Sequence, residues 1–344
     1  MSVPKTGDRI SNYILEAPVG EGSFGQVWRA RHHMFDERVA IKIPTDTQYV
    51  RNLQREGVAV HGLRHPNIVR AIDLDPYADP PYFIMEYVAG PSLRAVIDGW
   101  KNGLPLDSAL AVMGGVLKAL SAAHDAGVIH RDIKPANILL TCSADEVDEI
   151  TDDMVRVTDF GLGRVGGMTT TSMMQSGSML TAEGKNISGT MAYMSPEQKE
   201  GHDGDARSDL YSCGIVLYEM LTGSRPQGAD PPSSLREDLP PYLDDVFRRC
   251  YTRHERRFSS AQQMLDTLSA GLSVAPLRAT SIGIRGSARC GGCGQPANSD
   301  DQFCISCGHQ LVEVVPRCPS CEAYVNRADR FCIFCGTDLR VKTA

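Results

Sequence analysis

The amino-acid sequence predicts an α+β fold, in which a small antiparallel sheet precedes a mostly helical region and a short cysteine-rich module ends the chain. Three observations support this order. Short strand patterns separated by turns occupy residues 10 to 43, helical patterns dominate from about residue 108 onward, and eight of the 11 cysteines lie between residues 290 and 335. At 344 residues the chain exceeds one average domain, so two domains are expected.

Hydrophobic spacing and turn residues predict the individual elements. Strands are expected over Tyr13–Val19, Gly25–Arg31 and Arg38–Ile43. Helices are expected over Ala109–Ala126, Ser208–Leu221, Tyr242–Tyr251 and Ala261–Leu268. The segment Ser273–Arg289 mixes small residues with Gly and Pro and shows no sustained period, which is typical of a linker.

The composition excludes several classes of protein. Hydrophobic residues at 42% and charged residues at 22% are ordinary for a folded domain and exclude a disordered or collagen-like chain. A formal net charge of -7 gives no sign of a large basic surface, so nucleic-acid binding is not expected. We found no run of about 20 apolar residues and no signal-peptide core in MSVPKTGDRI, so we expect no membrane segment and a cytoplasmic location. The oligomeric state stays open.

A glycine-rich turn separates the first two expected strands. Residues without Cβ allow backbone N–H groups to come close to a triphosphate. The GxGxxG pattern is weak evidence alone, because a glycine hairpin without a ligand fits it equally well, and a dinucleotide site would need a helix where a strand follows here. The turn consists of Gly20, Glu21, Gly22, Ser23, Phe24 and Gly25.

Lys42 ends the apolar run Val39–Lys42 on the third expected strand. An ammonium with apolar neighbours is costly to leave unpaired, so it needs phosphate and a carboxylate nearby. Glu56, on the helix expected to follow, is the candidate carboxylate. An exposed salt bridge is the alternative for Glu56, and Gly57 weakens the helix prediction. Val27 stands where a purine ring would need an apolar roof.

Two further motifs carry groups for metal binding and proton transfer. The segment HRDIKPAN places Asp132 and Asn137 five positions apart on one loop. Asp159, in Asp-Phe-Gly, supplies a second candidate metal ligand, and Met-Ser-Pro-Glu follows at residues 194 to 197. Their joint occurrence in this order makes chance negligible.

With these motifs, residues 10 to about 270 resemble eukaryotic-type protein kinases, and GTMAYMSPEQ at Gly189–Gln198 is similar to the bacterial serine/threonine branch. The resemblance implies a bilobal protein kinase fold over residues 10–272, with ATP between the lobes. It implies that Lys42, paired with Glu56, contacts the α- and β-phosphates, and that Asn137 and Asp159 bind Mg²⁺ or Mn²⁺.

The resemblance also assigns the reacting groups. Asp132 is expected to accept or orient the proton of the substrate hydroxyl. Lys134 is expected to contact the γ-phosphate, and together with Thr190 it indicates serine/threonine specificity. Met85 is expected to close the back of the purine pocket, and Glu86 to Val88 form the hinge that binds adenine through its backbone. The implied ATP-binding set is Gly20, Glu21, Gly22, Ser23, Phe24, Gly25, Val27, Ala40, Lys42, Met85, Glu86 and Val88.

Supporting roles follow from the same resemblance. Glu197 is expected to pair with Arg257, and Asp209 to anchor the backbone of the catalytic loop. Arg131 implies a pocket for a phosphate on the activation loop. Hydroxyl groups crowd that loop, so we expect autophosphorylation there, with an unregulated flexible loop as the alternative. They belong to Thr169, Thr170, Thr171, Ser172, Ser176, Ser178 and Thr181.

Cysteine pairs repeat with a period of 28 residues in units 290–311 and 318–339. The first unit has Cys290, Cys293, Cys304 and Cys307, and the second has Cys318, Cys321, Cys332 and Cys335. Each set of four can close a tetrahedral thiolate shell around Zn²⁺. An iron–sulfur centre or disulfides are the alternatives. The other cysteines, expected to be small buried or half-buried apolar residues, are Cys142, Cys213 and Cys250.

The cysteine pattern resembles the double zinc ribbon, here over residues 290–340. The resemblance implies two structural Zn²⁺ ions and a module that docks a protein partner or regulates the kinase, with nucleic-acid binding as the rival. For the whole chain we therefore expect an active kinase that uses ATP and a protein substrate bearing Ser or Thr. The alternative is a catalytically silent pseudokinase scaffold or a zinc-dependent binding protein.

Overall fold

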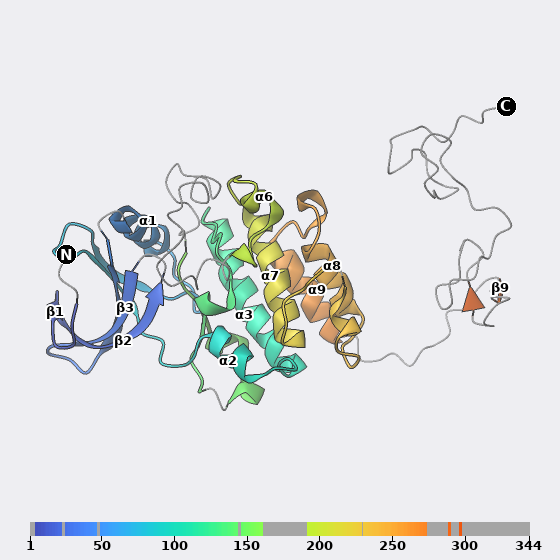
Figure 1. Ribbon diagram of the computed structural model, residues 1–344, viewed down its shortest axis with the longest axis horizontal. Helices are drawn as coiled ribbons and strands as arrows, with labels where there is room; N and C mark the ends of the chain where they lie inside the picture. Colours follow the sequence, from blue (N-terminus) through green and yellow to red (C-terminus); the bar gives the residue numbers. More distant parts are fainter. Residues whose placement is uncertain are drawn as a thin grey trace. The chain divides into compact units, whose positions relative to one another are not determined.

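The computed structural model divides the chain into two compact units, Met1–Val274 and Ala275–Ala344 (Figure 1). The structure describes residues 4–22, 25–46, 49–143, 146–160, 191–228, 230–273, 288–289 and 296–297. In the second unit it describes two short strands, β9 (Ala288–Arg289) and β10 (Pro296–Ala297), which pair antiparallel. The expected linker, Ser273–Arg289, therefore begins with the last residue of a helix, Ser273, and ends with β9. All eight expected zinc ligands lie outside the described residues.

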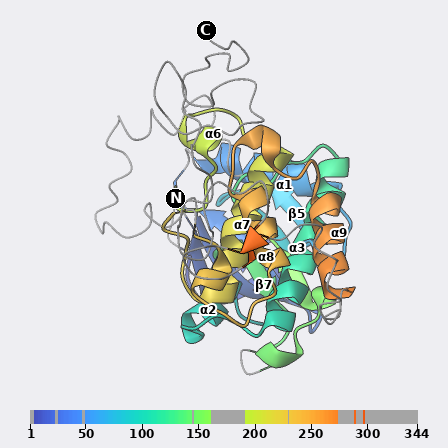
Figure 2. The same cartoon turned by 90° about the vertical axis from the view of Figure 1, so that its right-hand side faces the viewer.

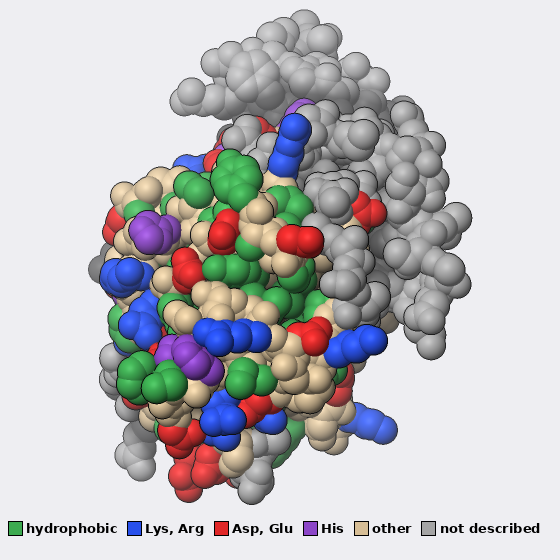
Figure 3. All heavy atoms as spheres, turned by 90° about the vertical axis from the view of Figure 1, so that its left-hand side faces the viewer, with side chains coloured by type: hydrophobic (Ala, Val, Ile, Leu, Met, Phe, Trp, Pro, Cys, Tyr) green, Lys and Arg blue, Asp and Glu red, His purple; other side chains and the backbone are tan. Residues whose placement is uncertain are grey.

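A six-stranded antiparallel sheet in the order β1-β2-β3-β4-β6-β5 forms the N-terminal lobe. Its strands are β1 (Arg9–Ile10), β2 (Tyr13–Gly22), β3 (Gly25–His32), β4 (Arg38–Pro44), β5 (Ala71–Asp75) and β6 (Tyr82–Glu86). The three expected strands are confirmed as β2, β3 and β4, and β2 continues into the glycine-rich turn. On the described part of the face in Figure 3, positive and negative side chains are interspersed.

Alternation along β4 divides the side chains of this lobe between two cores. Val39, Ile41 and Ile43 are buried in a small core with Leu15 and Trp28. Ala40, one step out of phase, belongs to the main core, as do Phe83 and Met85 on β6. The face of the sheet that carries Ala40 and Lys42 is thus directed toward the rest of the first unit.

Helix α1 (Val50–His61) contacts β5 and β6. Leu53 and Val60 are buried on its inner face. A Cβ added at Gly57 would lie 2.6 Å from Leu74 Cδ2, so a side chain there would require the Leu74 side chain or α1 to shift. Gly57, which weakened the sequence-based prediction of this helix, is therefore the residue that lets the helix pack closely.

Helices dominate the C-terminal lobe, where α7 and α8 pack together beside α3 and α9 (Figure 2). They are α2 (Leu93–Gly99), α3 (Leu106–Asp125), α6 (Pro196–Lys199), α7 (Ala206–Thr222), α8 (Tyr242–Cys250) and α9 (Ala261–Ser273). Short 3-10 turns are Pro135–Asn137, Val147–Glu149, Asp152–Met154, Pro232–Ser234 and His254–Arg256. The hairpin of β7 (Ile138–Leu140) and β8 (Val155–Val157) lies beside α3.

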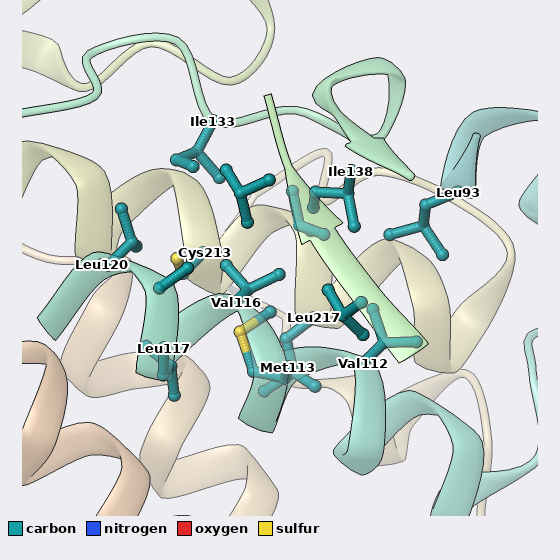
Figure 4. Packing of buried hydrophobic residues seen from close by; sticks show 14 of the residues in the cluster. Leu93, Val112, Met113, Val116, Leu117, Leu120, Ile133, Ile138, Cys213 and Leu217 are labelled. Atoms are coloured by element: carbon teal, nitrogen blue, oxygen red, sulfur yellow. The ribbon is translucent and has the colours of Figure 1, made fainter. Parts of the chain in front are cut away.

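The core of this lobe confirms the four expected helices and the three expected buried cysteines. Side chains from α2, α3, α7, β7 and the loop before β7 meet in Figure 4. The labelled ones are Leu93, Val112, Met113, Val116, Leu117, Leu120, Ile133, Ile138, Cys213 and Leu217.

Helix α3 is the one helix among the described residues that is long and apolar enough to cross a membrane. Of its 18-residue apolar window, 67% is buried inside the protein. A Cβ at Gly115 would lie 2.6 Å from Val155 Cβ, so α3 packs tightly on β8. Its apolar composition therefore reflects its place in the core.

Candidate active site

A buried ammonium lies between two carboxylates where the two lobes meet. Lys42 Nζ on β4 is 2.8 Å from Glu56 Oε2 on α1 and 3.0 Å from Asp159 Oδ1. The side chains of Lys42 and Glu56 are 4% and 1% exposed. This pairing confirms the expected partner of Lys42 and excludes the alternative of an exposed salt bridge.

The charges of this cluster depend on one another. Burial disfavours the ammonium of Lys42, but attraction to Asp159 and Glu56 outweighs burial and raises its pKa. Burial raises the pKa of Glu56, and Lys42 opposes that change. Burial also acts against the charged form of Asp159, but Lys42 lowers its pKa below the ordinary value. Asp159 is therefore the group that stays anionic and available to a cation.

Two polar side chains of the loop before β7, those of Lys134 and Asn137, contact Asp132. Lys134 Nζ donates to Asp132 Oδ2 at 2.8 Å, and Asn137 Nδ2 donates to the same oxygen at 3.2 Å. Asn137 Nδ2 also donates to the Asp132 carbonyl at 2.9 Å, which closes the loop on itself. The structure thus brings together the three residues that the motif HRDIKPAN predicted to act together.

Asp209, near the start of α7, anchors the backbone of this loop through hydrogen bonds. Its carboxylate accepts the backbone N–H groups of His130 at 2.9 Å and Arg131 at 2.7 Å, and it lies 2.8 Å from His124 Nε2. Asp209 is 1% exposed. Arg131 has φ 66°, a left-handed conformation that is costly for a residue with a side chain and that persists only where its surroundings enforce it. The expected anchoring role of Asp209 has this geometric basis.

The β7–β8 hairpin places two oxygen ligands at one end. Ile138 pairs with Val157, so Asn137, just before β7, and Asp159, two residues after β8, lie at the same end of the hairpin. Asp159 has φ 64°, and the Thr158 N–H donates to the Asn137 carbonyl at 3.0 Å. A carboxamide and a carboxylate suit Mg²⁺, which takes its other ligands from water and phosphate oxygens. The two residues therefore fit the expected metal.

Apolar residues line the expected purine pocket. Ala40 pairs with Met85 across β4 and β6, and both are buried, as is Val88. Met85 also lines a small cavity with Glu56, Thr158 and Phe160 behind it. Ala40 and Met85 thus stand where the sequence predicted the walls and the back of the pocket.

The glycine-rich turn is the tip of the β2–β3 hairpin, where Gly22 pairs with Gly25. A Cβ at Gly25 would lie 2.4 Å from the Ile43 carbonyl oxygen. Gly25 therefore permits close approach of β3 and β4 as well as the expected covering of phosphates. Val27, paired with Gly20, is half-buried at the base of this hairpin. Ser23 and Phe24 lie outside the described residues.

A buried ion pair confirms the expected brace of the lower lobe. Two guanidinium nitrogens of Arg257 lie 2.6 Å and 2.9 Å from the Glu197 carboxylate, and Ser208 Oγ donates to it at 2.7 Å. Burial acts against the charged form of Glu197, but the bonds from Arg257 and Ser208 dominate and lower its pKa to about 2.

We expect this brace to make the fold sensitive to acid. The pKa of Glu197 falls from 4.5 to about 2 on folding, so its stabilisation is complete above the higher value and is lost as pH falls toward the lower one. Glu197→Gln should therefore lower the free energy of unfolding at neutral pH and flatten its dependence on pH below about 5. Urea unfolding at several pH values measures both, with Glu255→Gln, an exposed neighbour, as the matched control. Equal profiles for the two variants would contradict this role.

One network was missed by the sequence analysis. The Tyr193 hydroxyl donates to Glu219 Oε2 at 2.5 Å, and Arg94 NH1 on α2 donates to Glu219 Oε1 at 2.9 Å. Ser212 Oγ donates to the Tyr193 carbonyl at 2.8 Å, and Gln198 Nε2 donates to the Arg131 carbonyl at 2.9 Å. The segment after the activation loop is thereby tied to α2, α7 and the catalytic loop. Tyr193 lay within a quoted motif, but nothing in the sequence pointed to Arg94.

The hydroxyl residues expected on the activation loop all lie outside the described residues: Thr169, Thr170, Thr171, Ser172, Ser176, Ser178, Thr181 and Thr190.

Comparison with known proteins agrees with this geometry. A probable serine/threonine-protein kinase of Clostridium perfringens is 34% identical over 279 residues, 75% of this chain and 38% of the relative. Serine/threonine-protein kinase pkn3 of Myxococcus xanthus is 38% identical over 243 residues, 67% of this chain and 42% of the relative. The chain thus spans well under half the length of these two relatives.

A solved structure shows the same fold. The crystal structure of the Mycobacterium tuberculosis PknI kinase domain superimposes with a TM-score of 0.59 at 24% identity, and it covers 78% of this chain and 100% of that domain. Residues 13–272 match the family described as Protein kinase domain, and residues 290–336 match the family described as Double zinc ribbon. The chain therefore belongs to the protein kinase family and carries a double zinc ribbon after its kinase domain.

Proposed function

We propose that this chain is an ATP-dependent serine/threonine protein kinase that transfers the γ-phosphate to Ser or Thr hydroxyls of a protein substrate. The observation that carries the proposal is the complete set of reacting groups in one place: Lys42 between Glu56 and Asp159, and Asp132 beside Lys134. The names of the relatives as serine/threonine-protein kinases support it.

The geometry gives each group a part in the reaction. The substrate hydroxyl oxygen attacks the γ-phosphorus, the bond from that phosphorus to the β,γ-bridging oxygen breaks, and ADP leaves. Asp132 takes the hydroxyl proton, and Lys134, whose Nζ lies 2.8 Å from Asp132 Oδ2, would contact the transferred phosphoryl group. Lys42 holds the α- and β-phosphates while Glu56 fixes its position. A magnesium ion held by Asn137 and Asp159 would neutralise phosphate charge when bound.

Identification of the phosphorylated amino acid tests the proposed specificity. The full chain is incubated with Mg²⁺ and ATP labelled in its γ-phosphate, and the labelled proteins are hydrolysed to separate phosphoserine, phosphothreonine and phosphotyrosine. We expect label on serine or threonine. Label confined to tyrosine would overturn the specificity, although the chain would remain a kinase.

We expect the chain to phosphorylate its own activation loop, which we place between residues 165 and 188 because hydroxyl residues are dense there. Mass spectrometry after incubation with Mg²⁺ and ATP measures the modified sites, with the Asp132→Asn chain as the control. The wild-type chain should carry phosphate in this range and the variant should not. Phosphate found only elsewhere would contradict autophosphorylation of this loop.

The tandem cysteine units are proposed to hold two structural zinc ions and to dock a protein partner or regulate the kinase. The zinc-ribbon family match and the complete set of four cysteines in each repeat support this proposal. We also propose a cytoplasmic location with no membrane or nucleic-acid partner. The sequence features that support it are the lack of a long apolar run, the lack of a signal-peptide core and the net charge of -7.

Metal analysis checks the zinc proposal. We expect two zinc ions per chain by plasma mass spectrometry, and one after the double replacement Cys290→Ser and Cys293→Ser, because a thiolate set of two no longer closes a tetrahedral shell. Cys142→Ala, a cysteine outside the repeats, should keep both ions. Iron in place of zinc, or no metal in the wild-type chain, would contradict the proposal.

A further inference from the structure

A cavity of about 360 Å³ lies behind the expected hinge, apart from the groups that react with ATP. Its wall comes from the segment between α1 and β5, the end of β6 and the middle of β8. A volume of this size falls within the range of about 300–1,000 Å³ that is usual for small-molecule sites. The lining residues are Leu63, Arg64, His65, Pro66, Ile68, Arg70, Glu86 and Arg156.

Positive charge dominates the lining of this cavity. It contains the guanidinium groups of Arg64, Arg70 and Arg156 and a single carboxylate, that of Glu86. Three positive charges against one negative charge leave a surplus of two. Burial, with Lys118 as the second cause, lowers the pKa of His65, so its ring adds a neutral polar group near pH 7. The cavity therefore favours an anion, although the net charge of the whole chain is -7.

Two of the three guanidinium groups are free to bind a ligand. Within the described part of the chain, the side chains of Arg64 and Arg70 form no hydrogen bond and no ion pair, and both residues are exposed at the rim. Arg70 contacts Glu86 through its backbone, because its N–H donates to Glu86 Oε2 at 3.3 Å. Each guanidinium offers five N–H donors in a planar fork. The rim thus presents donors without acceptors.

The third guanidinium is held in place by backbone carbonyls and has only a long ion pair with Glu86. Arg156 NH1 donates to the carbonyl groups of Asp153 at 2.5 Å and Val155 at 3.0 Å, which fixes its plane, and the side chain is 19% exposed. Its nearest carboxylate, Glu86, lies 3.7 Å from Arg156 Nε, too far for a hydrogen bond. The Arg156 side chain is therefore already fixed before a ligand binds, and its positive charge can still attract a second anion.

We propose that this cavity binds a phosphoryl group through Arg64, Arg70 and Arg156. A phosphate dianion matches the surplus of two positive charges, and its oxygens accept paired N–H bonds from planar guanidinium groups. Inorganic phosphate and a phosphorylated serine side chain present the same chemistry to these guanidinium groups. This site is distinct from Lys42, Lys134 and the metal ligands, so its occupancy does not depend on phosphoryl transfer.

Calorimetric titration of the full chain with two probes tests the proposal. One probe is inorganic phosphate, and the other is a short phosphoserine peptide compared with its unphosphorylated form. Saturating ADP and Mg²⁺ fill the nucleotide site first. The variants are Arg64→Ala, Arg70→Ala and their combination, with Arg248→Ala on α8 as the matched control, because Arg248 is an exposed arginine far along the chain from this cavity. Thermal unfolding checks that each variant is folded.

We expect one site per chain, at least tenfold weaker binding in the double variant, and unchanged binding in Arg248→Ala. Glu86→Gln should strengthen binding, since it removes the one carboxylate of the lining. Phosphate binding equal to that of the phosphopeptide assigns the site to a free anion, and stronger binding of the phosphopeptide alone assigns it to a phosphorylated segment. Absence of binding by both probes, or binding that the double variant retains in full, would overturn the proposal.

Discussion

Lys42→Met should lower the rate of phosphoryl transfer by a factor of about 10²–10³, the usual effect of removing one preorganised electrostatic contact. Lys42 is the only cation bonded to Glu56 and Asp159 among the described residues, so its loss leaves two carboxylates close together with no positive charge between them. Steady-state transfer of labelled phosphate at saturating ATP measures the rate.

The same substitution should also affect stability. Removing one partner of a buried ion pair costs about 3–5 kcal/mol when the other charge stays buried. Burial already raises the pKa of Glu56, and Lys42 opposes that change, so Glu56 in the variant can take up a proton and reduce the cost. We therefore expect a moderate loss in the free energy of unfolding that becomes smaller toward lower pH. Transfer above about one-tenth of the wild-type rate would show that Lys42 lacks the proposed role.

Asp209→Asn should reduce both stability and turnover, although Asp209 lies outside the reacting groups. The carboxylate accepts three bonds, from His130 N–H and His124 on one oxygen and from Arg131 N–H on the other. Asn keeps only one acceptor oxygen, so its NH₂ faces at least one of these donors and leaves it unpaired. Loss of the left-handed Arg131 conformation would shift Asp132, and a displacement of about 1 Å can lower a rate about 100-fold.

Separate measurement of turnover and nucleotide affinity distinguishes this effect from a change in the ATP site. We expect a lower kcat with little change in the KM for ATP, because Lys42, Ala40 and Met85 are untouched. Asp245→Asn, an exposed carboxylate on α8, is the matched control and should leave both values unchanged. An unchanged kcat in a folded Asp209→Asn chain would show that the loop holds its shape without this anchor.

The residues of the site could be predicted from the sequence because phosphoryl transfer requires particular groups in a particular order. Lys42 and Asp159 each stood in a recognisable motif, and Glu56 was the candidate carboxylate on the helix expected between them. The structure places Lys42 Nζ 2.8 Å from Glu56 and 3.0 Å from Asp159. The strands β5 and β6 were not predicted. Their segments are only five residues each, and their place in the sheet depends on distant partners, because β6 pairs with β4 and β5 pairs with β6.

Features that depend on distant partners were also beyond the sequence. Gly57 disfavours a helix locally, but its missing Cβ lets α1 approach Leu74 on a strand that follows it. Arg94 has no motif around it, and its role depends on the hydrogen bond it donates to Glu219, which belongs to another helix. The basic cavity joins residues from three separate segments, and no spacing rule connects Arg64 with Arg156. Packing, rather than local preference, decides each of these cases.

Transfer of labelled γ-phosphate from ATP by the full chain, in wild-type and Asp132→Asn form, tests the account most directly. The mixture contains Mg²⁺, zinc and a basic model protein, and Asp148→Asn, an exposed aspartate, is the matched control. We predict labelling by the wild-type and Asp148→Asn chains and a rate lower by about 10²–10⁴ for Asp132→Asn, the usual contribution of a general base. A wild-type chain that transfers no phosphate, or an Asp132→Asn chain that labels equally well, would contradict the proposed kinase activity and favour a scaffold.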